Sequence, residues 1–179
     1  IYIFMKYYNL FFIISVLIAG PIQDASKQYI IEQFPINTKI VMHTLQLENK
    51  IKSKIQILAK QKFYLDKLYY WNISNNDSTI AYAFLDNVKG KTMPITFMVI
   101  LNINGNVKNT TIIKYREGYG GEVSNERWLA QFGHYNPDST FKVGKDIDAI
   151  TGATISTNSI SKGVYKITLL YPMIKEQLQ

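Results

Sequence analysis

The 179-residue sequence contains no cysteine. Without a thiolate, the chain has no Cys nucleophile, no disulfide, and no Cys ligands for zinc or an iron–sulfur cluster. A packed core does not require disulfides at this length, because 47% of the residues are hydrophobic and only 18% are charged. The lack of cysteine therefore excludes several kinds of chemistry, and the cellular compartment has to be inferred from other features.

Arginine is also scarce. The formal net charge is +7, but lysine carries nearly all of the positive charge, and Arg116 and Arg127 are the only arginines. Proteins that read a nucleic-acid sequence rely mainly on arginine, so we expect no nucleic-acid partner. The scattered lysines fit better with a weak attraction to an anionic membrane surface or to an acidic partner.

Side chains suited to acid–base or nucleophilic catalysis are not grouped in the sequence. His43 and His134 are far apart, and we interpret both as structural residues rather than as metal ligands or proton carriers. The hydroxyl-rich stretch 156–161 lacks the Gly-x-Ser-x-Gly turn and the His/Asp pairing of hydrolases. We therefore predict neither a catalytic residue nor a metal site in this chain.

An apolar run, residues 10–19, follows Met5 and Lys6 and precedes Gly20-Pro21. A cationic start, a short apolar stretch and small residues after it are typical of a secretory signal, and the run is short for a helix that spans a bilayer. We predict a signal peptide over residues 1–22, with a retained membrane anchor or a buried N-terminal helix as alternatives. A signal or an anchor would place the protein in the periplasm or on the outer face of the cytoplasmic membrane.

The next segment, residues 23–75, is expected to be mainly helical. Asp24 is a suitable N-cap for a first helix, which Pro35 would end. Apolar residues then recur at spacings of three and four over 47–58, with lysines between them, which predicts an amphipathic helix. A strand is expected over 67–73, before a polar turn.

Strands dominate the first half of the remaining segment, residues 76–179. Asn104-Gly105 separates two runs of high β propensity and is a strong signal for a hairpin. Further elements are expected in this order: strands over 79–85, 94–102 and 107–115, a short helix over 126–132, a short strand over 140–144 and a final helix over 156–173. The pattern predicts an α+β fold, in which a mostly antiparallel sheet and flanking helices form a single domain after the N-terminal segment.

The start of the final helix contains small and hydroxyl-bearing residues. Glycine at position 152 lets the backbone approach a ligand closely, and the N-terminus of a helix attracts anions. The hydroxyls of Thr151, Thr154, Ser156 and Thr157 can add hydrogen bonds to phosphate oxygens. The same residue types also cap helices without any ligand, and local physics alone favours this plain cap over a phosphate site.

The seven residues Asp148-Ala149-Ile150-Thr151-Gly152-Ala153-Thr154 resemble the flavinylation motif of the FMN-binding domain family. This family includes components of the sodium-pumping NADH:quinone reductase and of the Rnf electron-transport complex, and many secreted stand-alone proteins. Its pattern is Asp, a small residue, any residue, Ser or Thr, Gly or Ser, Ala and Thr, and every position is met here. The resemblance implies that Thr154 is the residue to which FMN is attached.

A second stretch resembles the same family. Gly118-Tyr119-Gly120-Gly121-Glu122 corresponds to a Gly-rich loop that lies against the flavin, and residues 128–132 correspond to the helix after it. The loop differs somewhat from that of the Rnf and sodium-pump components, which carry Thr-Pro before it. A stand-alone secreted member therefore fits the sequence better than a component of either complex.

The resemblance implies a cofactor, partners and a function. FMN would be bound covalently through a phosphoester to Thr154, with Gly152, Ala153 and the Gly-rich loop as further binding residues. A flavin transferase that uses FAD and a divalent metal would form the bond. The expected function is electron transfer with a redox partner protein or a membrane electron-transport complex, rather than that of a stand-alone enzyme. A reversible FMN-binding module, a flavin-dependent reductase of a small substrate and a structural domain that is never modified remain alternatives.

Overall fold

The computed structural model describes residues 20–178. The segment 1–22, predicted to be a signal or anchor, therefore lies almost entirely outside the described residues. Within residues 20–178, no helix is both long enough and apolar enough to cross a membrane.

Five antiparallel strands form one sheet, with the order β1-β2-β3-β4-β5. The strands are β1 (Lys39–Gln46), β2 (Lys67–Asn75), β3 (Ser78–Lys89), β4 (Pro94–Asn102) and β5 (Val107–Lys114). At the turn between β4 and β5, Gly105 adopts φ +85°, a conformation that favours glycine, and its N–H donates to the carbonyl of Asn102. The predicted antiparallel sheet and its Asn-Gly hairpin are confirmed.

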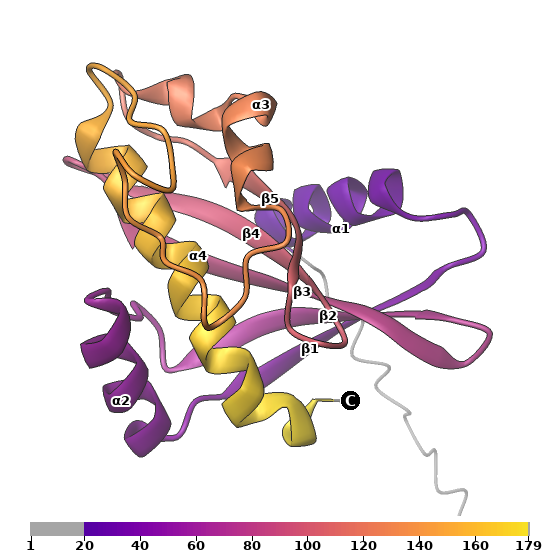
Figure 1. Ribbon diagram of the computed structural model, residues 1–179. Coiled ribbons are helices and arrows are strands. Elements are labelled where there is room, and N and C mark those ends of the chain that lie inside the picture. Colours follow the sequence, from indigo (N-terminus) through magenta and orange to yellow (C-terminus); the bar gives the residue numbers. More distant parts are fainter. Residues whose placement is uncertain (1–19, 179) are drawn as a thin grey trace, which may run out of the picture.

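Helices cover both faces of this sheet, so the molecule has three layers (Figure 1). On one face, α1 (Pro21–Gln33) packs with Ile30 against Trp71 and Met98. On the other face lie α2 (Asn49–Ala59) and the long α4 (Thr154–Ile174). Alternate strand residues fill the two cores, as expected for a sheet buried on both sides. The predicted α+β class, a single domain with flanking helices, is confirmed.

Between β5 and α4 the chain is mostly irregular, with short helical pieces. These are η1 (Gly121–Ser124), α3 (Glu126–Leu129) and η2 (Ala130–Phe132), and a last turn, η3 (Lys175–Gln177), follows α4. The strand predicted over 140–144 is wrong, because only an isolated bridge joins Val143 to Ile147. The carboxylate of Asp146 accepts hydrogen bonds from the Thr140 hydroxyl and the Lys142 N–H, which folds this segment into a turn.

The segment 23–75 is less helical than expected. It contains α1 and α2, but also β1 and β2, and β1 was not predicted at all. As an edge strand, β1 has no fully buried residue, so its sequence lacks the strong apolar alternation of a central strand. The first helix also begins earlier than predicted: Gly20 is the N-cap, and Asp24 lies in the first turn.

Candidate functional site

The predicted flavinylation motif, residues 148–154 (the threonine motif), ends where α4 begins. Thr154 is the first residue of the helix, and Ala153 is its N-cap without any side-chain capping bond. Thr157 is fully buried and its hydroxyl donates to the carbonyl of Ala153 at 2.8 Å, while Ser156 Oγ lies 3.1 Å from Tyr115 Oη. The hydroxyls therefore do not form the plain helix cap that local physics favoured.

The first turn of α4 consequently has free hydrogen-bonding capacity. The backbone N–H groups of Thr154, Ile155 and Ser156 form no hydrogen bond with another residue in the range 20–178, and the first bond of the helix runs from Thr157 N to Ala153 O. The Thr154 hydroxyl is exposed and also has no partner in that range. Three free N–H groups at the positive end of a helix are suited to binding a phosphate.

A cavity of about 440 Å³ opens at this helix terminus. Its walls come from three parts of the chain: Lys91, Glu117, Tyr119, Gly120 and residues 152–156. The volume falls within the range of about 300–1,000 Å³ that is typical of small-molecule sites. The fold thus brings the predicted Gly-rich loop and the predicted threonine motif to one cavity.

Not every predicted site residue reaches this cavity. Gly152, Ala153, Thr154, Ser156, Tyr119 and Gly120 line it. Thr151 and Gly118 lie in the adjoining loops and Gly121 and Glu122 in η1, all outside its wall, and Thr157 points into the protein core.

Gly120 is the point of closest approach between the Gly-rich loop and α4. Its φ is +82°, and a Cβ atom at this position would lie 2.8 Å from Tyr115 Oη and 3.2 Å from Ser156 Oγ. Tyr115 joins the two segments, because its hydroxyl donates to the carbonyl of Tyr119 at 2.5 Å and also meets Ser156. The sequence did not reveal this role of Tyr115, since a tyrosine at a strand end has no distinguishing local pattern.

The beginning of the threonine motif is held by the short helices before it. Trp128 Nε1 donates to the carbonyl of Asp148 at 2.8 Å, and Gln131 Oε1 accepts from Asp148 N at 2.9 Å. The N-terminus of this helix pair is capped by Asn125, whose side chain accepts from two backbone N–H groups. The two stretches that resemble the family are therefore physically connected, and the connection orients the loop that leads to Thr154.

Glu117 also lines the cavity, and no pattern in the sequence pointed to this residue. Its carboxylate accepts hydrogen bonds from Thr92 N and Thr92 Oγ1, both at 2.7 Å, and from Met93 N at 3.1 Å. These bonds lower the pKa of Glu117 below its ordinary value. Gly90 is required in the same turn, because a Cβ there would collide with the backbone carbonyl of Met93 as well as with a Glu117 oxygen. The β3–β4 hairpin is thereby held against the Gly-rich loop.

The two histidines lie away from this cavity. His43 stacks on the ring of Tyr70, with the ring centroids 5.2 Å apart, and His134 N donates to the carbonyl of Val107. Among residues 20–178, no group of three or more His, Cys, Asp or Glu side chains is arranged to hold a metal ion.

Comparison with known proteins agrees with this geometry. Residues 90–168 match the family model described as FMN-binding domain. The matched span includes Glu117, the Gly-rich loop, the threonine motif and most of α4, so it contains every residue that lines the cavity. This part of the chain is therefore similar to FMN-binding domains.

A curated relative comes from Clostridium ljungdahlii. It is the component designated G of the proton-translocating ferredoxin:NAD(+) oxidoreductase complex, and the chain is 27% identical to it over 133 residues. The match covers 70% of this chain and 65% of the relative. The chain thus has a segment that matches the FMN-binding domain model and has distant similarity to this component of a proton-translocating oxidoreductase complex.

Proposed function

We propose that the protein is an exported electron-transfer flavoprotein whose FMN is joined by a phosphoester to Thr154. The observation that carries the proposal is the start of α4. There, an exposed threonine hydroxyl and three free backbone N–H groups belong to residues that line a cavity. The family match supports FMN as the cofactor. Attachment through Thr154 rests on the motif together with this geometry.

The residues of the cavity fit FMN. The N–H groups of Thr154, Ile155 and Ser156 would bind the phosphate, and the helix dipole and Lys91 would offset the charge that a phosphodiester keeps. Tyr119, which is 91% exposed, can cover one side of the flavin ring. FMN itself supplies one- or two-electron transfer when bound, while the protein sets its environment. No residue of the chain needs to act as a catalyst in this function.

The partners follow from the same proposal. During maturation a flavin transferase would use FAD, so that Thr154 Oγ bonds to the FMN phosphorus, the hydroxyl proton is lost and AMP leaves. In use, the protein would exchange electrons with a redox partner or with a membrane electron-transport complex, and the name of the relative supports the second. A location outside the cytoplasm depends on the segment 1–22, and membrane association through an anchor belongs to the same proposal.

The direct test is the intact mass of the protein after co-expression with a flavin transferase. We expect the wild type to gain the mass of one FMN less one water, and Thr154→Ala to gain nothing. Thr44→Ala, which alters an exposed threonine on β1, is the matched control and should load fully. The flavin should remain on the chain after denaturation, since a covalent bond survives unfolding.

Several outcomes would contradict this proposal. Flavin that dissociates on denaturation would favour the reversible FMN-binding module. An FMN-sized gain that persists in Thr154→Ala would move the attachment, with Thr151 and Thr157 as the next candidates. Turnover of a small substrate by the loaded protein, without a protein partner, would favour the reductase.

A further inference from the structure

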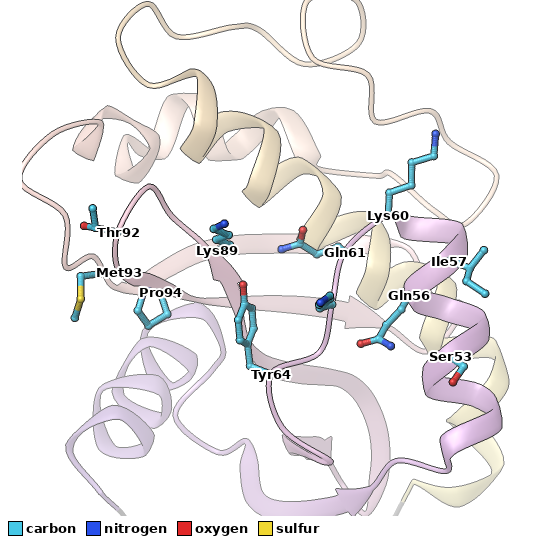
Figure 2. A pocket seen from close by; sticks show the side chains of 11 residues that line it. Ser53, Gln56, Ile57, Lys60, Gln61, Tyr64, Lys89, Thr92, Met93 and Pro94 are labelled. Atoms are coloured by element: carbon cyan, nitrogen blue, oxygen red, sulfur yellow. The ribbon is translucent and has the colours of Figure 1, made fainter.

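A second and larger hollow lies beside the FMN cavity, with a volume of about 1100 Å³. Figure 2 shows that α2 forms one side of this groove, that Thr92, Met93 and Pro94 of the β3–β4 hairpin form the other, and that Gln61 and Tyr64 lie between them. The volume exceeds the range of about 300–1,000 Å³ for small-ligand sites. Because the hollow is an open groove lined by exposed side chains, an interaction surface for a macromolecule is the better interpretation.

The groove is positively charged. Lys60, Lys62 and Lys89 are among its eleven lining residues, none of which is acidic. All three lysines are exposed, and none makes an ion pair with another residue in the described range 20–178. Two nearby acidic groups are paired with lysines outside the groove, since Asp66 pairs with Lys52 and Asp86 with Lys166. The carboxylate of Glu117 is hydrogen-bonded to Thr92 and Met93. The charge of the groove is thus available to an anionic partner.

Apolar side chains provide contact area between these charges. Ile57 is 76% exposed, and Met93 and Tyr64 are each about half exposed. An aromatic ring and exposed aliphatic groups with a charged rim are typical of protein–protein contact surfaces. Weak electron-transfer encounters use small interfaces of this kind, often with complementary charge that speeds association.

The groove and the FMN cavity have a common wall. Thr92 and Met93 line the groove, whereas Lys91, next to them in the hairpin, lines the cavity. Glu117, also in the cavity wall, holds Thr92 and Met93 through three hydrogen bonds. On the other side, the buried Lys166 donates to the carbonyl of Lys62 at 2.7 Å and fixes the loop after α2. A partner in the groove would therefore contact a rigid hairpin that borders the cofactor.

We propose that this groove, lined by Lys60, Lys62 and Lys89, is the docking surface for the acidic face of a small electron-transfer protein. Such a partner would place its redox group next to the hairpin that borders the FMN. The nature of the partner rests on the proposed electron-transfer function, but the location and charge preference of the surface do not.

The soluble domain of cytochrome b5, a small acidic haem protein, is a suitable probe. We would titrate it into the isotope-labelled chain and follow amide chemical shifts by NMR. The largest shifts should fall on residues 53–64 and 89–94, and Lys62→Glu/Lys89→Glu should weaken binding roughly tenfold. Binding should also weaken at physiological ionic strength, where the Debye length is about 8 Å.

Lys27→Glu/Lys39→Glu is the matched control. Each substitution changes the charge by −2, so both double variants lower the formal net charge from +7 to +3, but Lys27 and Lys39 lie on α1 and β1. We expect this control to change the affinity less than about twofold. Equal weakening in both variants would show a mere effect of net charge and would overturn the proposal, as would shifts that map elsewhere.

Two further measurements separate the possible outcomes. Vesicles containing phosphatidylglycerol test the alternative occupant: if Lys62→Glu/Lys89→Glu abolishes vesicle binding but leaves cytochrome b5 binding intact, the groove faces a membrane and the proposal is wrong. In the FMN-loaded and reduced protein, Lys62→Glu/Lys89→Glu should slow the transfer of one electron to each ferric haem in the same proportion as it weakens binding. If no flavin is loaded, the proposed function fails while the NMR titration still decides whether the groove docks an acidic protein.

Discussion

Gly120 shows how one residue sets the shape of the proposed FMN cavity. It holds a left-handed backbone at the place where the Gly-rich loop meets the start of α4, within contact distance of Tyr115 and Ser156. Gly118, two residues earlier, has open space around it and no such backbone requirement. The same amino acid therefore serves different purposes at the two positions, although the sequence presents them as one motif.

We predict that Gly120→Ala lowers the free energy of unfolding by about 1–2 kcal/mol, the cost of a left-handed non-glycine residue. The new methyl group would also push the loop away from Ser156 and reduce flavin loading. Gly118→Ala should change stability by less than about 0.5 kcal/mol. Urea denaturation and intact mass would measure the two effects, and equal stability of both variants would contradict the assigned role of Gly120.

At the scale of elements, the β3–β4 hairpin is held by Glu117. This residue directly precedes the Gly-rich loop and connects that loop to the hairpin. Because its hydrogen bonds favour the carboxylate, the pKa of Glu117 in the folded protein is below the ordinary value of 4.5. A lowered pKa stabilises the fold fully above the ordinary value, and this contribution is lost as the pH falls through the folded-state pKa.

We therefore predict that acidification below about pH 4.5 loosens the hairpin through Glu117. In Glu117→Gln this part of the pH dependence should be absent. The measurement is thermal unfolding of wild type and variant at several pH values, with hydrogen exchange of the Thr92 and Met93 amides as a local readout. An identical pH dependence of these amides in both proteins would exclude Glu117 as the group responsible.

At the scale of the whole molecule, a buried ion pair joins the helical layer to the sheet. Lys166 of α4 and Asp86 of β3 lie 2.7 Å apart, and the Lys166 side chain is fully buried. Burial lowers the pKa of Lys166 and raises that of Asp86, and each charge opposes this shift in the other. Lys166 Nζ also lies 4.2 Å from the centre of the Phe63 ring. One side chain thus ties together α4, the central strand and the loop after α2.

We predict that Lys166→Met alone destabilises the protein by about 3–5 kcal/mol, because it leaves a buried carboxylate without its partner. The double variant Asp86→Leu/Lys166→Met should recover most of this loss, since apolar side chains of similar size need no compensation. Chemical denaturation of the wild type, both single variants and the double variant gives the coupling energy. Additive losses would show that the pair does not act as a unit.

Local sequence patterns determined a large part of this protein. The apolar runs and Asn104-Gly105 predicted the antiparallel strands, and the spacing of apolar residues predicted the helix over 47–58, which the structure forms as α2. The motif ending at Thr154 predicted the likeness to FMN-binding domains that the family model also finds, because the residues of the motif are contiguous. These features depend on neighbours along the chain, which the sequence displays directly. The edge strand β1 was missed for the opposite reason, since its half-buried side chains leave only a weak pattern.

Only the tertiary structure decided how the start of α4 is used. Local physics alone favoured hydroxyls that cap the helix, whereas the family resemblance favoured a phosphate site. In the structure Ser156 contacts Tyr115 and Thr157 bonds to the carbonyl of Ala153, so the N–H groups of the first turn stay free. The roles of Tyr115 and Glu117, and the meeting of the groove with the cavity at the hairpin, likewise depend on residues distant in sequence. Packing brings such residues together, and no local pattern records which segments will meet.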